Sequence, residues 1–182
     1  MILVSSNREK IKEFRRLLAP EIKVEVRKEE YDEIRSDDAA KIAAVAAEEL
    51  AARLQQPVMV EDAGIFIDAL HGFPGTYSKH VYNKIGLPGL VKLLEGENNR
   101  RAYYQSAIAY CEPGKKAKTF VGRCYGSIAT EKRGSNGWGH DPIFIQAGKR
   151  KKYGELKKPG DVSLHRIRSA AKLKKFLLSL RK

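Results

Sequence analysis

The chain has 182 residues, 42% hydrophobic and 31% charged, which indicates a globular protein with a buried core rather than a disordered one. No apolar run approaches the roughly 20 residues of a membrane-spanning helix, and the first residues do not resemble a signal peptide. Cys111 and Cys124 lack metal-ligand spacing and predict free thiols in a reducing compartment. We therefore expect a cytoplasmic protein without a membrane partner.

The net charge of +13 is concentrated near one end of the chain. Residues 149–182 contain 13 Lys and Arg against two acids. Such a segment can bind a polyphosphate or RNA, or can form a solvated helix face, and long cations are usually exposed. Nucleic-acid binding through stacked bases requires aromatic side chains among the cations, and only Tyr153 lies in this basic loop. We expect nucleic acid not to be the partner.

Helical and strand-like patterns alternate along the first third of the chain. They predict a strand at 2–4, a capped helix that ends at Pro20, a half-exposed strand at 22–26, a helix at 38–54 and a buried strand at 58–60. The last of these strands leads directly into two acidic residues.

Antiparallel pairs are predicted further along. The patterns indicate a turn at 72–75, an amphipathic segment at 87–94, long strands at 102–111 and 119–129, a loop at 134–139, and a strand at 143–145. A final helix begins near 163, with Ile167, Ala170, Ala171, Leu173 and Leu177 on its inner side. The whole predicts one α/β domain over 1–182, with a mixed twisted sheet flanked by helices and arranged in two lobes.

The first polar cluster lies where the first strand meets the first helix. Ser6, Asn7 and Lys10 occupy a helix N-terminus, whose backbone N–H groups and dipole favour phosphate. The alternative is an ordinary capped helix with a surface lysine.

The second cluster is the adjacent pair Glu61 and Asp62 after the buried strand. Two carboxylates there are costly unless they bind a cation or act as a base, and Mg²⁺ prefers carboxylate and phosphate oxygens. The alternative is that both cap the turn that follows.

The third and fourth clusters carry groups that suit a purine. Trp138 stands between two glycines beside His140 and Asp141, which is typical of a base-stacking platform, although it can also fix the loop onto the core. His165 and Arg166 begin the last helix, and arginine can donate to the O6 and N7 edge of a purine.

Four motifs together carry a family resemblance over nearly the whole chain. They are SSNREKIKEF (5–14), VEDAGIFIDALHGFPGTYSK (60–79), GSNGWGHDPIF (134–144) and HR (165–166). With them the sequence resembles the inosine-triphosphate pyrophosphatase (ITPase) family, particularly its archaeal branch. The resemblance implies a homodimer whose two lobes enclose a nucleotide cleft, and Mg²⁺-dependent cleavage of ITP, dITP and XTP to the monophosphate and pyrophosphate.

The resemblance also implies a role for each matched residue. Ser6, Asn7 and Lys10 would hold the triphosphate, Glu33 and Asp62 the metal with support from Glu61, and Asp62 would activate water. Trp138 would stack on the base, Gly139 would also bind the substrate, and Asp141, His165 and Arg166 would contact the base.

This sequence departs from the family pattern in several places. The second helix has Ala46 or Glu48 where the family has a phosphate-binding lysine, and Lys158 is the candidate for the lysine that precedes the final motif. Leu164 interrupts that motif, and His140 replaces an aromatic residue. The alternative function is therefore a nucleotide- or nucleic-acid-binding protein of the same fold with reduced or altered activity.

Overall fold

The computed structural model describes residues 1–156 and 164–181, and these form two compact units. The first unit contains Met1–Asp62, Ser106–Gly122 and His165–Lys182. The second contains Ala63–Gln105 and Arg123–Leu164. Each unit has its own hydrophobic core, so the two are described separately.

A seven-stranded mixed sheet has the order β2-β1-β3-β5-β6-β7, with β4 paired to β3. Its strands are β1 (Ile2–Val4), β2 (Glu25–Arg27), β3 (Val58–Ile67), β4 (Pro74–Gly75), β5 (Arg101–Cys111), β6 (Lys118–Ile128) and β7 (Phe144–Gln146). Strand β1 pairs in parallel with β2 and β3, whereas β3–β4 and β6–β7 are antiparallel. The α/β class with a mixed sheet flanked by helices is confirmed.

Four α-helices accompany the sheet in the described part of the chain. They are α1 (Arg8–Leu18), α2 (Ala39–Leu54), α3 (Ser78–Lys92) and α4 (Leu164–Ser179). None of the helices within residues 1–156 and 164–181 combines the length and apolar composition needed to cross a membrane.

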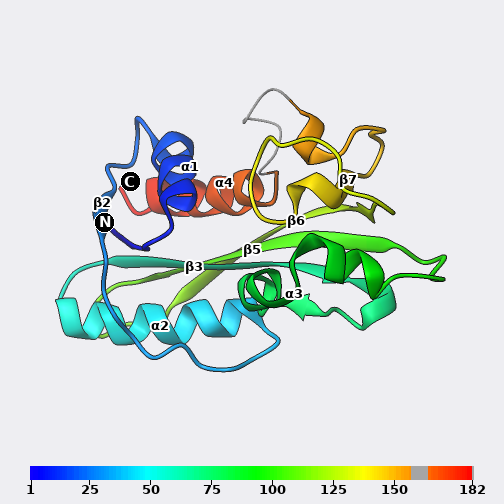
Figure 1. The fold of residues 1–182 in the computed structure, drawn as a ribbon. Helices are drawn as coiled ribbons and strands as arrows, with labels where there is room; N and C mark the ends of the chain where they lie inside the picture. The colour runs from blue at the N-terminus through cyan, green and yellow to red at the C-terminus, as the bar shows by residue number, and fades with distance from the viewer. Residues whose placement is uncertain (157–163, 182) are drawn as a thin grey trace. The chain divides into compact units, whose positions relative to one another are not determined.

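In the first unit, helices cover both faces of β1 and β3 (Figure 1). Helices α1 and α4 pack on one face, where Leu3 and Met59 contact Phe14, Leu18 and Leu173. Helix α2 packs on the opposite face through a cluster that contains Ile2, Val4, Val58, Val60, Ala43 and Leu50. Successive strand residues therefore alternate between the two helical layers, as the pleat of a strand requires.

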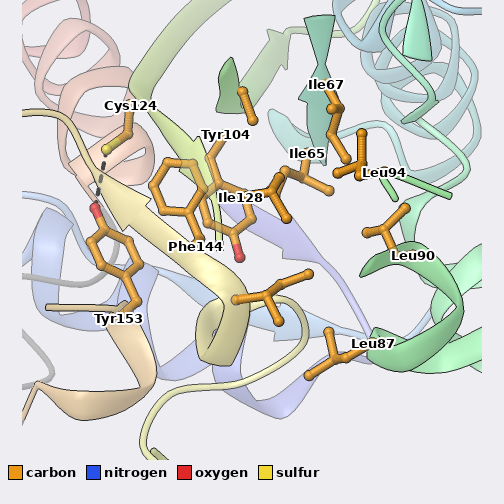
Figure 2. Packing of buried hydrophobic residues seen from close by; sticks show 12 residues of the cluster. Ile65, Ile67, Leu87, Leu90, Leu94, Tyr104, Cys124, Ile128, Phe144 and Tyr153 are labelled. Atoms are coloured by element: carbon orange, nitrogen blue, oxygen red, sulfur yellow. Dashed lines mark hydrogen bonds between the residues drawn. The ribbon is translucent and has the colours of Figure 1, made fainter. Parts of the chain in front are cut away.

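The second unit has a separate core of aliphatic and aromatic side chains (Figure 2). Ile65 and Ile67 of β3 pack with Leu87 and Leu90 of α3. The hydroxyl of Tyr153 lies 3.0 Å from Cys124 Sγ inside this core. Both cysteines are buried and neither forms a disulfide, which agrees with the predicted free thiols.

Two expectations about the elements were wrong and one was incomplete. Strand β3 does not end at Val60 but continues through the acidic pair to Ile67. The amphipathic segment expected at 87–94 corresponds to the part of α3 after a kink at Gly86, where φ is 63°, and the part from Ser78 to the kink was not predicted. On α4, Ala171 is exposed, while His165, Arg166 and Ser169 are buried with the apolar residues.

Candidate active site

The N-terminus of α1 is capped as the sequence predicts. Asn7 Oδ1 accepts hydrogen bonds from the backbone N–H groups of Glu9 and Lys10 at 3.0 and 3.2 Å. Ser6 is exposed. The cap fixes the first turn of the helix and with it the origin of the Lys10 side chain.

Lys10 points from α1 to β3. Its ammonium donates to the backbone oxygen of Glu61 at 3.1 Å and lies 2.9 Å from Glu61 Oε2. The other carboxylate oxygen, Oε1, accepts from Ser106 Oγ at 2.7 Å and from Arg166 Nε at 3.0 Å. Both oxygens of Glu61 are therefore engaged by donors of the first unit.

Arg166 and its neighbours complete this buried ion-pair network. A second carboxylate, Glu13 of α1, lies with its Oε2 3.3 Å from Arg166 Nη1. Ser169 Oγ lies 2.9 Å from Ser106 Oγ and donates to the Arg166 carbonyl. The name "Glu61 network" is used below for Lys10, Glu13, Glu61, Ser106, Arg166 and Ser169.

Glu61 stays ionised inside the protein. Burial acts to raise the pKa of its carboxyl, but the charges of Arg166 and Lys10 and their hydrogen bonds outweigh burial and lower the pKa to about 2. Burial and the charge of Arg166 lower the pKa of His165 well below its usual value, so its imidazole is neutral near pH 7.

Helix α4 approaches the sheet closely at Gly122 of β6. A Cβ at this position would lie 2.1 Å from the carbonyl oxygen of His165 and 2.5 Å from the backbone N of Ser169. Only glycine admits the helix at this distance. The close approach lets the first turns of α4 bury polar side chains next to β3.

Asp62 belongs to the other face of β3. Alternation along the strand places Glu61 with Met59, under α1 and α4, and Asp62 with Val60, on the side of α2. Tyr31 lies near Asp62, because burial and the charges of Glu33, Asp62 and Glu49 raise the pKa of Tyr31 to about 12. The sequence treats Glu61 and Asp62 as one acidic pair, and the structure separates their side chains.

The carboxylates near Tyr31 have the donor chemistry of a magnesium site. Glu33 is exposed and Asp62 is half-buried, so both can present oxygens to a cation. Mg²⁺ in nucleotide sites commonly takes one or two carboxylates and completes its coordination with water and phosphate. Within residues 1–156 and 164–181, no group of three or more His, Cys, Asp or Glu residues is arranged to hold a metal alone.

A cavity of about 540 Å³ lies in the same part of the first unit. Its lining consists of Glu29, Glu30, Tyr31, Asp32, Glu49 and Arg53. Four carboxylates against one guanidinium disfavour a triphosphate in this cavity. The cavity is therefore not assigned as the phosphate site.

The loop around Trp138, in the second unit, is held by Asp141. Asp141 Oδ2 accepts from the Trp138 backbone N–H at 2.8 Å, and Oδ1 accepts from the Tyr104 hydroxyl at 2.9 Å. Gly137 has φ 75°, and a Cβ there would lie 2.2 Å from Asp141 Oδ2. Asp141 is 5% exposed, so the structure shows it organising the loop that carries Trp138 and Gly139.

His140 is buried in this loop against the edge of the Tyr82 ring, with ring centroids 5.5 Å apart. Burial lowers its pKa to about 4, so the ring is neutral at physiological pH. His140 therefore places an uncharged ring at the position where the family has an aromatic residue.

The lysine that the family has in its second helix is replaced in this chain by Ala46 or Glu48, and the structure shows where these residues lie. Ala46 is part of α2 and is buried in the core of the first unit. Glu48 accepts from the Ala117 backbone N–H at 3.0 Å and pairs with Lys116. Lys158 lies outside the described residues.

Glu13, Ser106, Ser169 and Tyr31 are site residues that the sequence did not indicate. Ser106 and Ser169 each precede a buried alanine, Ala107 and Ala170, and this position next to apolar residues was the available signal. The residues that they contact are distant in the sequence, so patterns among neighbouring residues do not predict these contacts.

The fold and the site define an α/β protein in which the capped N-terminus of α1 carries Lys10. This helix terminus lies next to β3, which presents Glu61 on one face of the sheet and Asp62 on the other. Residues 1–176 match the model of the family described as the Ham1 family. The chain belongs to the Ham1 family, and the family resemblance inferred from the sequence is confirmed.

Relatives and solved structures support the same assignment. A dITP/XTP pyrophosphatase of Korarchaeum cryptofilum is 45% identical over 178 residues, which cover 98% of this chain and 96% of the relative. One of Methanosarcina acetivorans is 43% identical over 92% of this chain and 89% of the relative. The Staphylococcus aureus Ham1 protein superposes with a TM-score of 0.85 and 28% identity, covering 98% of this chain and 97% of that one. A Mycobacterium abscessus structure described as nucleoside-triphosphatase / dITP/XTP pyrophosphatase has a TM-score of 0.77 and 29% identity, over 94% and 97% of the two chains.

Proposed function

We propose that the protein is a nucleoside-triphosphate pyrophosphatase that cleaves non-standard purine nucleotides (ITP, dITP and XTP) to the monophosphate and pyrophosphate. The observation that carries this proposal is the match to dITP/XTP pyrophosphatases over nearly the full length of both chains. Removing such nucleotides keeps deaminated purines out of nucleic acid. Release of pyrophosphate from dITP in the presence of Mg²⁺ tests it directly.

The first unit supplies groups suited to a triphosphate. Lys10, beside the capped terminus of α1, offers a cation to phosphate oxygens, with Ser6 and Asn7 at the same terminus. Glu33 and Asp62 would hold Mg²⁺, which neutralises phosphate charge when bound. Asp62 is the carboxylate that would accept the proton of the attacking water, as the bond between the α-phosphorus and its bridging oxygen breaks.

The base is assigned to other residues. Trp138, with Gly139 beside it, would stack on the purine, while Asp141 fixes their loop. His165 is neutral and can donate one N–H to an oxo group. Arg166, whose Nε and Nη1 contact Glu61 and Glu13, would also contact the base.

Trp138→Ala is expected to raise the KM for dITP on the order of 10- to 100-fold, because stacking on a base contributes about 1–3 kcal/mol. Trp138 is the only tryptophan, so its fluorescence should also change when dITP binds. An unchanged KM together with constant fluorescence at saturating nucleotide would exclude the stacking role.

A nucleotide-binding protein with reduced activity is the second candidate. It is favoured by Ala46 and Glu48, which leave no cation at the family's second-helix lysine position. A homodimer also belongs to the proposal, supported by the family resemblance and by exposed Phe73, Tyr77 and Ile85 on the second unit.

A further inference from the structure

Two helices on one face of the first unit carry a large excess of positive charge. Helices α1 and α4 lie side by side there (Figure 1), and Phe14 of α1 and Leu173 of α4 belong to one apolar cluster beneath them. Together the two helices contain ten Lys and Arg against two acids. Residues 28–56, which include α2 on the opposite face, contain eight acids against four cations. The charge of this unit is therefore segregated between the two faces of the sheet.

The exposed cations of α1 and α4 recur at helical spacing. We name them the basic face: Arg8, Lys12, Arg15 and Arg16 on α1, and Arg168, Lys172 and Lys175 on α4. Residues three or four positions apart lie on the same side of a helix. Each helix buries its apolar side on the sheet, so the basic face points away from the sheet on both helices.

This arrangement does not serve the stability of the helices. Like charges one turn apart destabilise a helix, whereas opposite charges stabilise it. Helix α2 shows the stabilising arrangement, with Arg53 Nη1 3.5 Å from Glu49 Oε1. Within residues 1–156 and 164–181, Lys12, Arg16 and Lys175 form no ion pair. Their charges are therefore available to a partner.

The spacing of these cations suits a phosphate backbone. Four residues advance an α-helix by about 6 Å. The phosphates of one strand of duplex DNA recur about every 3.4 Å along the axis, so cations one turn apart match roughly every second phosphate. Contacts of Lys and Arg with phosphates fix a protein on DNA and carry no sequence information.

Other polyanions require groups of a different kind. Single strands are bound by aromatic side chains that stack on bases, but Phe176 of α4 is half-buried and its ring contacts Phe120 and Lys118. A membrane surface requires a helix whose apolar side is open to lipid, whereas the apolar sides of α1 and α4 are packed. The expectation that nucleic acid is not a partner rested on base stacking, which a duplex backbone does not need.

We propose that the basic face binds the phosphate backbone of double-stranded DNA without reading its sequence. The surface is separate from the proposed catalytic groups, because the Lys10 side chain points to β3 and its ammonium donates to the backbone oxygen of Glu61. Binding of DNA goes beyond the cleavage of nucleotides and does not depend on it.

The test measures the Kd of the full chain for a short fluorescently labelled DNA duplex at several salt concentrations, without nucleotide. The test variant combines Lys12→Gln, Arg16→Gln and Lys175→Gln. The control variant loses the same charge from exposed cations of the second unit and combines Lys84→Gln, Lys92→Gln and Arg150→Gln. A difference between the two variants is then due to the position of the charges and not to the net charge.

The wild type should bind the duplex with a Kd on the order of 10⁻⁶ to 10⁻⁴ M at physiological salt. The test variant should bind about tenfold more weakly or worse, and the slope of log affinity against log salt should be smaller by about 3, since each phosphate contact contributes about 0.9. The control variant should stay within about twofold of the wild type. Both variants should cleave dITP as the wild type does, whereas Lys10→Met should lose cleavage and keep the duplex Kd.

Several results would overturn the proposal. They are an equal loss of affinity in the test and control variants, no loss in the test variant, or binding of a single strand, duplex RNA or anionic lipid vesicles about tenfold tighter than duplex DNA. If circular dichroism shows that the test variant does not fold, Lys12→Gln and Lys175→Gln are measured singly, and each should lower the slope by about 1. A wild-type protein that releases no pyrophosphate overturns the proposed function alone, because duplex binding is measured without dITP.

Discussion

Asp62→Asn is expected to lower the turnover of dITP by roughly 10²-fold or more, while the fold is kept. The amide has almost the same shape as the carboxylate but cannot accept a proton from water and is a weaker ligand for Mg²⁺. Asp62 is half-buried on the α2 side of β3, in the neighbourhood of Tyr31 and Glu33. Steady-state pyrophosphate release at saturating Mg²⁺ measures the effect.

Asp68→Asn is a suitable control for this substitution. Asp68 is exposed and forms a surface ion pair with Arg101, so its substitution should change turnover less than twofold. An Asp62→Asn protein that retains most of its turnover and a wild-type circular dichroism spectrum would remove Asp62 from the mechanism.

The second large effect is on stability. Arg166→Leu should lower the free energy of unfolding by about 3–5 kcal/mol, because it leaves the buried Glu61 carboxylate without its guanidinium partner. Substituting Glu61→Leu in the same chain should recover part of that loss, since Lys10 and Glu13 keep some exposure to solvent. Urea unfolding of the two single variants and the double variant gives the coupling energy, and simple additivity would show that the pair is not coupled.

This stability should depend on pH in a defined direction. The folded-state pKa of Glu61 is about 2, below its ordinary 4.5, so the contribution is present above pH 4.5 and is lost as pH falls toward 2. A depression of this size corresponds to stabilisation on the order of 3 kcal/mol. The difference in unfolding free energy between the wild type and Glu61→Gln should therefore narrow between pH 4.5 and 2. A difference that stays constant across this range would contradict the assigned ionisation.

Local features of the fold were predictable because local sequence decides them. The Asn7 cap and the Ala-rich helix α2 depend on nearby residues, and the bounds expected for α2, 38–54, differ from the observed ones by one residue. Strands β5 and β6 were predicted from the long strand-like patterns at 102–111 and 119–129. Helix α3 was predicted only from its second half, since its first half is largely polar and exposed up to the kink at Gly86.

The candidate site was harder to predict because its contacts are non-local. Glu61 looked like the end of a strand, since a carboxylate inside a buried strand is costly without partners. Those partners, Ser106 and Arg166, lie 45 and 105 positions away along the chain. Once β3 is known to continue past Val60, alternation along the strand places the Glu61 and Asp62 side chains on opposite faces, which the expected shorter strand did not show.

The measurement that tests the central claim most directly is the product analysis of dITP and dATP incubated with the wild-type protein and Mg²⁺. We expect dIMP and pyrophosphate in equal amounts from dITP, with kcat/KM roughly 10²-fold higher than for dATP, because an N–H donor such as that of His165 pairs with an oxo group and is left unpaired against an amino group. Release of orthophosphate and dIDP, equal cleavage of dATP, or binding of dITP without cleavage would each contradict a pyrophosphatase selective for non-standard purines.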